Sequence, residues 1–408
     1  MKTTILFIIT AMLLGFSSCK KENPEIPQEP TVITLPEKAN DVILQNNNFG
    51  IDLFKKTALS ENTNLMLSPL SANIALTMLL NGCNTQTYEQ IRDMLGYGDL
   101  TMDEINATYK SLVSQLLAAD PQVNIALANA VWYKDGFAVK PAYLGAMGAS
   151  FDAEIGSLDF NSPSALETIN GWASDNTKGK IPKVINEISP DAVMFLMNAL
   201  YFKGTWTYQF DKNLTANRTF YLGDGTSKQA SSMSSDINVK YFATSDYSAI
   251  EMPYGRQNFS MVVILPAATL DNFMENFNGS DWVQLTNEFD ENTSTYEIEV
   301  TMPRFKFEFE KVLNDQLKAM GMTDAFYPAL ADLSNIADEN LYVSFVQQNT
   351  FVDVNEEGTE AAAVTTVGIN YTSVGPEPFI VNKPFVFAIR ERTTNTLLFI
   401  GKVENPGY

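Results

Sequence analysis

The spacing of apolar residues predicts helices in the first third of the chain. Apolar residues recur at helical spacing in residues 41–58, as on the buried face of a helix. The pair Ser68-Pro69 is typical of a helix start, because a residue in the first turn needs no partner for its N–H. The apolar run that follows, residues 72–80, predicts a buried helix. Helical spacing then continues over residues 95–120.

The rest of the chain carries the alternation that is typical of strands. Segments rich in β-branched and aromatic residues, with a period near two, predict strands. These strands cover residues 123–133, 192–202, 239–243, 260–266 and 296–303. Helical spacing returns in residues 270–277 and 309–320. Since no internal repeat and no proline-rich linker divides residues 38–408, we expect one large α+β domain.

One stretch, residues 355–367, has the pattern of a loop that can become a strand. Gly358 gives it a flexible start, because glycine reaches most backbone conformations without steric cost. In a strand, Thr359 and the odd-numbered residues after it would share one face, and all of them are small or β-branched. Glu360 would point to the other face. No charge and no proline follows in residues 361–375, so nothing there opposes strand pairing or burial.

This stretch resembles the reactive-loop hinge of the serpins, inhibitors of serine proteases that insert a cleaved loop into a sheet. Two later segments, residues 379–385 (FIVNKPF) and 397–406 (LLFIGKVENP), resemble the C-terminal signature of that family. Further segments similar to serpin motifs are residues 64–71, 198–206, 302–305 and 331–334. The resemblance implies a serpin fold for residues 38–408. Such a fold is a single large domain with a large mixed main sheet, further sheets, about eight or nine helices and an exposed reactive loop, here about residues 356–378.

The same resemblance implies roles for particular residues. The hinge would consist of Glu357, Gly358, Thr359, Glu360, Ala361, Ala362 and Ala363. A polar cluster beneath the point where the main sheet opens would consist of Ser68, Ser71, Asn198, Trp206 and Gln348. Gln348 stands where the family often has a histidine. Because an amide offers a donor and an acceptor but does not titrate, we expect no pH dependence from this position.

By resemblance, the protein is a suicide substrate and not an enzyme. A serine protease, or a cysteine protease, would attack the loop and be trapped in a covalent complex when the cut loop enters the main sheet. Family spacing assigns the scissile bond to Thr372-Ser373, with Tyr371 as the alternative. No Lys or Arg lies between Gly358 and Asn382, which favours elastase-like, chymotrypsin-like or subtilisin-like targets over trypsin-like ones. The alternative function is that of a non-inhibitory serpin acting as a surface binding protein, but the hinge lacks the proline or bulky charge that would block insertion.

The composition of the chain excludes several kinds of catalytic and metal site and argues against one class of partner. The 408 residues include 48 acidic and 27 basic ones, for a net charge of −21, which argues against nucleic acid as a partner. Because the chain has no histidine, it cannot form a Ser-His-Asp or Cys-His catalytic site or a His-based zinc site. Its two cysteines, Cys19 and Cys83, give no disulfide framework. We expect a monomer without a metal or a cofactor.

The N-terminus resembles that of a bacterial lipoprotein. Residues 1–18 have a basic start and an apolar run, as a signal peptide does. Cys19 follows two serines, as in the lipobox whose cysteine is lipidated, although Phe16 replaces the usual aliphatic residue; the alternative is an ordinary secretory signal. Residues 19–37 would form a proline-rich tether. The absence of Asp after Cys19 favours, by resemblance to Gram-negative lipoproteins, the outer membrane of the cell envelope, with the body on its inner or its outer face.

Overall fold

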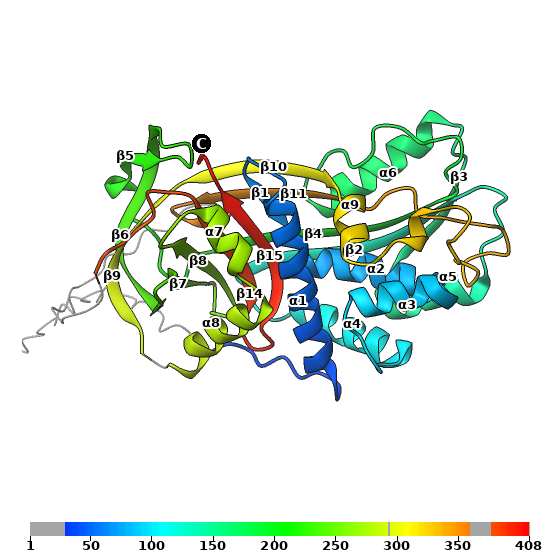
Figure 1. Cartoon of the computed structure of the whole chain (residues 1–408), viewed down its shortest axis with the longest axis horizontal. Helices are drawn as coiled ribbons and strands as arrows, with labels where there is room; N and C mark the ends of the chain where they lie inside the picture. The colour runs from blue at the N-terminus through cyan, green and yellow to red at the C-terminus, as the bar shows by residue number, and fades with distance from the viewer. Residues whose placement is uncertain (1–28, 293, 360–376, 408) are drawn as a thin grey trace, which may run out of the picture.

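Two β-sheets and the helices around them form the single α+β domain of this protein (Figure 1). The computed structural model describes residues 29–292, 294–359 and 377–407. The six-stranded sheet, called the main sheet below, has the strand order β10 (Phe305–Val312), β11 (Gln347–Asn355), β12 (Gly358–Thr359), β4 (Met194–Thr205), β2 (Val123–Lys134) and β3 (Glu154–Leu158). It is a mixed sheet, because β2 and β3 are parallel and the other pairs are antiparallel.

The nine-stranded sheet packs beside the main sheet. Its strand order is β1 (Leu65–Leu67), β15 (Thr396–Val403), β14 (Phe385–Glu391), β8 (Phe259–Pro266), β7 (Tyr247–Tyr254), β6 (Ser227–Ala243), β9 (Tyr296–Pro303) and β13 (Phe379–Ile380), with β5 (Ala216–Tyr221) paired to β6. The α-helices of the described residues are α1 (Ala39–Ala58), α2 (Pro69–Gly82), α3 (Thr85–Met94), α4 (Met102–Leu116), α5 (Pro141–Phe151), α6 (Pro163–Asn176), α7 (Leu270–Asn276), α8 (Gly279–Glu291) and α9 (Asn314–Ala319).

Helices cover both faces of the main sheet at β4. The buried helix α2 belongs to the large core, together with Leu200 and Phe202 of β4. Trp172 of α6 packs in a second, separate core with Trp132 of β2 and Ala199 of β4. Because successive residues of a strand point to opposite faces, α2 lies on one side of the sheet and α6 on the other, as Figure 1 shows. We call these the inner and the outer face.

The prediction of a helix over residues 309–320 is wrong in its first part. The chain remains in β10 up to Val312, and α9 begins only at Asn314. Charged residues alternate with Phe305, Phe307 and Phe309, and this period of two is typical of a strand and not of a helix.

The helix predicted within residues 95–120 begins later than its apolar spacing suggests. Gly96 and Gly98 adopt left-handed backbone with φ of 72° and 51°, which interrupts helical geometry. A capping box then starts α4, since the Thr101 hydroxyl accepts from the backbone N–H of Glu104 and the Glu104 carboxylate accepts from that of Thr101.

The described end of the expected tether lies against the body and does not project from it. The side-chain amide of Asn258 pairs with the backbone N–H and C=O of Thr31, and that of Gln115 does the same with Thr34, at 2.7–2.9 Å. Ile33 between them is 7% exposed and joins the core. A free spacer would therefore end near residue 30. Among the described residues, no helix is long and apolar enough to cross a bilayer.

Candidate functional site

The two-residue strand β12 lies between β11 and β4 at one end of the main sheet. Thr359 lies opposite Val354 of β11 and Gly204 of β4, antiparallel to both. Along the rest of their described length, β11 pairs with β10 and β4 pairs with β2. The facing edges of β11 and β4 are thus joined through β12 alone in the part of the chain that the structure describes.

A cavity of about 550 Å³ opens between β4 and β11 beyond β12. Residues 194–200 of β4 and residues 347–350 of β11 line its two long sides. Leu76 of α2 closes it on the inner face, and Trp172 of α6 closes it on the outer face. We call this cavity the slot. An extended segment there would meet backbone donors and acceptors on two strand edges and apolar side chains on two helices.

Gly358 begins β12 at a point where no side chain fits. Its φ is 148°, and a Cβ atom would overlap the carbonyl oxygen of Gly204 on β4. Only glycine lets the two backbones approach this closely.

Thr359 points into the inner core of the main sheet. Its side chain is 3% exposed, and its hydroxyl lies 2.8 Å from the hydroxyl of Tyr254. Tyr254 stacks on Trp206 with ring centroids 4.3 Å apart and contacts Phe202 edge to face. Burial raises the pKa of Tyr254, so its hydroxyl stays protonated and the hydrogen bond with Thr359 joins two neutral hydroxyls.

The segment that follows β4 holds the chain just before β12. The backbone N–H of Trp206 donates to the carbonyl of Glu357 at 2.9 Å, and that of Phe210 donates to the carbonyl of Glu356 at 3.0 Å. The indole N–H of Trp206 donates to the carbonyl of Asn355 at 2.9 Å. Three consecutive carbonyls are therefore fixed, so the direction in which the chain enters β12 is set.

Two ion pairs hold the same segment. Glu356 is 2% exposed, and its carboxylate accepts from Arg304 Nε at 2.8 Å, from Arg304 Nη2 at 2.5 Å and from the hydroxyl of Thr215. Glu357 pairs with Lys212, whose side chain is half exposed. Burial acts to raise the pKa of Glu356, but the hydrogen bonds from Arg304 and Thr215 outweigh it and lower that pKa.

The lowered pKa of Glu356 predicts a loss of stability in acid. A carboxylate with a depressed pKa stabilises the fold above its unfolded value and loses this contribution as the pH falls through its folded value. We expect Glu356→Gln to lower the melting temperature at pH 7, and the gap to the wild type to narrow below about pH 4. Thermal melts of both proteins between pH 7 and pH 3 test this. A gap that stays constant over this range would contradict the role given to the charge.

Three residues of the expected sheet-opening cluster lie together at the slot. The side-chain amide of Gln348 donates to the carbonyl of Ser68 at 2.8 Å, and its oxygen accepts from the N–H of Ser68 at 3.1 Å. The Ser68 hydroxyl accepts from the N–H of Ser71 at the start of α2 and donates to the carbonyl of Leu398. Gln348 thus ties β11 to the helix beneath the sheet without a titratable group.

The other two residues of that cluster have other partners. Asn198 lies on β4 and also lines the slot, but its amide donates to Asn129 Oδ1 of β2 at 2.6 Å. Within the described residues, its own Oδ1 is buried without a hydrogen-bond partner. Trp206 lies beside β12, stacked on Tyr254. The five residues therefore form two groups along the slot and a third at β12.

Several predicted positions fall outside the described residues: Glu360, Ala361, Ala362 and Ala363 of the hinge, Tyr371, Thr372 and Ser373 at the expected reactive bond, and Cys19. Thr215 and Tyr254 were not predicted; they contact Glu356 and Thr359 from 141 and 105 residues away along the chain. Arg304 lies inside the motif at residues 302–305, but nothing in that motif indicates its partner.

The comparison with protein families agrees with this fold. The profile of the family described as Serpin (serine protease inhibitor) matches residues 44–406. The chain belongs to the serpin family.

Individual relatives cover nearly the full length of the chain. An uncharacterized serpin-like protein of Methanosarcina mazei is 32% identical, over 99% of this chain and 98% of its own. The leukocyte elastase inhibitor of Xenopus tropicalis is also 32% identical, over 88% of this chain and 97% of its own. Among solved structures, the thermophilic serpin tengpin in its native state matches with a TM-score of 0.81 and 29% identity, covering 93% of this chain and 97% of that one.

Proposed function

We propose that the protein is a suicide-substrate inhibitor of serine proteases that traps its target by inserting the cut reactive loop into the slot. The observation that carries this proposal is β12, because its two residues already pair with both β11 and β4 above an open slot. The protein would act as a substrate whose product rearranges, and it needs no catalytic group of its own.

The register of β12 indicates how the loop would continue. Because Thr359 lies opposite Val354 and Gly204, each further residue steps one position back along both strands, so that Thr366 would meet Gln347 of β11 and Met197 of β4. Hydrogen bonding of residues 360–366 would contribute on the order of 5–10 kcal/mol before any packing. This energy could distort the acyl-enzyme if insertion is faster than deacylation.

The sequence of the loop favours particular proteases. We propose Thr372-Ser373 as the reactive bond, with Tyr371 as the alternative residue before the cut. The absence of Lys and Arg from residues 359–381 favours elastase-like, chymotrypsin-like or subtilisin-like enzymes, since a trypsin-like pocket finds no cation. One relative is named leukocyte elastase inhibitor, which is consistent with this class of target.

We predict a denaturant-stable covalent complex with an elastase-like or a subtilisin-like enzyme and poor trapping of trypsin. Gel electrophoresis after incubation with a panel of proteases detects the complex, and mass spectrometry of the released C-terminal peptide locates the cut. Cleavage without any complex would favour a non-inhibitory serpin. A released peptide that begins outside residues 372–374 for every trapped enzyme would refute the proposed bond.

We also propose that residues 1–18 are a lipoprotein signal peptide and that Cys19 carries a lipid anchor in the outer membrane. Cys19→Ala is expected to move the protein from the membrane fraction to the soluble fraction, since the acyl chains supply the membrane affinity. Fractionation followed by immunoblotting measures this. Membrane association that persists in the variant would exclude the anchor.

A further inference from the structure

A buried carboxylate joins the two sheets near β12. Asp120 lies between α4 and β2 and is 3% exposed. Its Oδ1 accepts from the backbone N–H of Gln122 at 2.9 Å, and its Oδ2 accepts from that of Arg256 at 2.6 Å. The first bond belongs to the turn that leads into β2 of the main sheet. The second belongs to the turn between β7 and β8 of the nine-stranded sheet.

The register of the main sheet puts Asp120 at the same end of the sheet as the hinge. The carbonyl of Asp120 accepts from the N–H of Val123, the first residue of β2, at 3.2 Å. Val123 lies opposite Gly204 of β4. Gly204 in turn lies opposite Thr359 of β12. Asp120 is therefore at the level of β12 and two strands away from it.

The turn that Asp120 holds is the one that follows Tyr254. Tyr254 ends β7, and Gly255 after it has left-handed backbone with φ of 49°. A Cβ atom on Gly255 would lie 2.6 Å from Asp120 Oδ2, so only glycine allows both this backbone conformation and the approach of the carboxylate. The N–H of Gly255 donates to the carbonyl of Thr205 on β4 at 2.8 Å. The chain just after Tyr254 is therefore fixed by β4 on one side and by Asp120 on the other.

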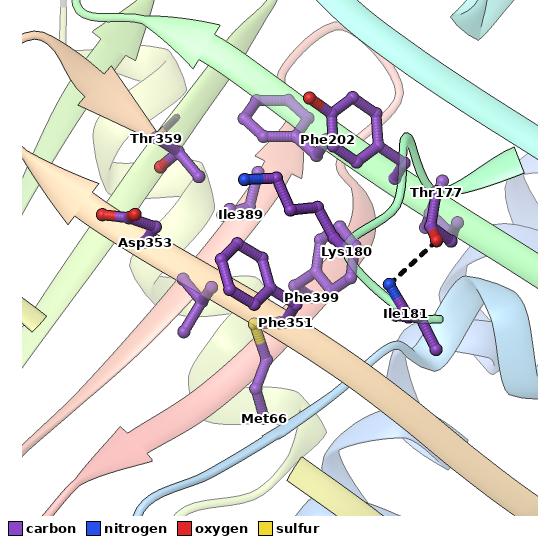
Figure 2. Close-up of a pocket in the computed structure, with 13 residues that line it drawn as sticks. Met66, Thr177, Lys180, Ile181, Phe202, Phe351, Asp353, Thr359, Ile389 and Phe399 are labelled. Carbon is purple, nitrogen blue, oxygen red and sulfur yellow. Dashed lines mark hydrogen bonds between the residues drawn. The ribbon is translucent and has the colours of Figure 1, made fainter. Parts of the chain in front are cut away.

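Tyr254 is the side chain that holds Thr359 on the inner face. The two hydroxyl groups lie 2.8 Å apart. On the side of the slot, Thr359 borders a small cavity of about 20 Å³, which Phe202 and Asp353 also line (Figure 2). Because packing is incomplete on that side, Thr359 has space to shift toward the slot. The position of the Tyr254 hydroxyl therefore determines how firmly Thr359 stays between β11 and β4.

We propose that Asp120 is a positioning residue for the hinge. By holding the turn between β7 and β8, it keeps the hydroxyl of Tyr254 against Thr359, and so it keeps β12 paired before the loop is cut. Asp120 acts through Tyr254, whose hydroxyl makes the contact with the hinge. This inference rests on the proposed inhibitory function, because a paired β12 speeds the insertion step that competes with deacylation.

A double-mutant cycle tests the positioning role. Asp120→Asn keeps the shape of the side chain but leaves one oxygen to accept from two N–H groups, and Tyr254→Phe removes only the hydroxyl. Each single variant is expected to raise the inhibition stoichiometry about threefold, as for the loss of one hydrogen bond. The double variant should do no worse than either single variant, because Asp120 acts through the same hydroxyl. Effects that multiply to about ninefold would overturn the proposal.

Asp332→Asn is the matched control for a turn held elsewhere. The Oδ1 of Asp332 accepts from the backbone N–H of Ser334 at 3.2 Å, and its Oδ2 accepts from the hydroxyl of Thr85 at the start of α3. This variant should lower the melting temperature and leave the inhibition stoichiometry unchanged. A rise as large as that of Asp120→Asn would show that the loss of any such turn has this effect, and the positioning role would be wrong.

Hydrogen–deuterium exchange of the intact, full-length protein separates the positioning role from the inhibitory function. Asp120→Asn and Tyr254→Phe should each speed exchange about threefold in the peptide that contains residues 354–359, and Asp332→Asn should not. Faster exchange there, with no protease trapped by the wild type, would support the positioning role and refute the inhibitory function. Unchanged exchange, with protease trapped by the wild type, would overturn the positioning role and leave the inhibitory function standing. Absence of both would overturn both.

Discussion

Replacing Thr359 by arginine is expected to turn the inhibitor into an ordinary substrate. Thr359 is 3% exposed and lies against Tyr254, so a guanidinium there would be buried without a counter-ion. Such a charge costs about 3–5 kcal/mol, which slows insertion by a factor of about 100 or more. Attack on the distant reactive bond would continue, and deacylation would finish before insertion. The inhibition stoichiometry should therefore rise more than about tenfold.

Thr359→Ser is the matched control for this prediction. Serine keeps the hydroxyl that meets Tyr254 and removes only a methyl group, so most of the inhibition should remain. The wild-type chain should also gain marked heat resistance after loop cleavage, and the arginine variant should gain less. If Thr359→Arg still traps protease one-to-one, insertion next to β12 is not the mechanism.

Glu356→Lys, one residue before the hinge, is expected to destabilise the fold. The lysine would put a second cation against Arg304 in the place of a carboxylate that is 2% exposed. Breaking a buried pair in this way costs about 3 kcal/mol or more. For a chain of this size, that corresponds to a melting temperature lower by about 4 °C. Differential scanning calorimetry measures the change.

Glu357→Lys provides the contrast for this prediction, one residue along the same segment. The partner of Glu357 is Lys212, whose side chain is 54% exposed and can turn into water. Glu357 is itself only 6% exposed, but because its partner can move away from a new cation we expect a smaller loss of stability than for Glu356→Lys. Equal losses of stability in the two variants would show that the change in net charge destabilises the fold, and not the loss of the buried pair with Arg304.

Local patterns were sufficient for the elements that bury one regular face. The apolar run in residues 72–80 and the proline before it predict α2, and alternation predicts β2 and β8. The helices α3, α5, α6 and α8 were not predicted. The helix α3 buries only Thr87 and Ile91, whereas α8 buries Trp282, Leu285 and Phe289 at helical spacing and could have been predicted from that spacing. The strand in residues 309–312 was taken for a helix because the short α9 follows it directly.

The site was predictable only as far as the hinge pattern extended. That pattern indicated a strand-forming segment with Thr359 facing inward, and Thr359 is buried in β12. The partners of the segment depend on contacts between distant parts of the chain, such as Arg304 with Glu356 and Lys180 with Phe351. A polar residue gives no local sign of which distant residue it meets. For the same reason Asn198 and Gln348 were expected in one cluster, although they lie on opposite sides of the slot.

The short strand β12 also bears on how long the protein keeps its activity. The first paired residue of a new strand is the slowest to form, because it fixes the chain before later hydrogen bonds compensate for the lost entropy. In this chain Thr359 is already paired on both sides, so later residues only have to extend the strand. An uncut loop starts from the same paired residue as a cut one. The inhibitory activity of a preparation should therefore decline with a half-life that shortens on warming. The reason is that the uncut loop would insert slowly by the same route that the cut loop takes rapidly.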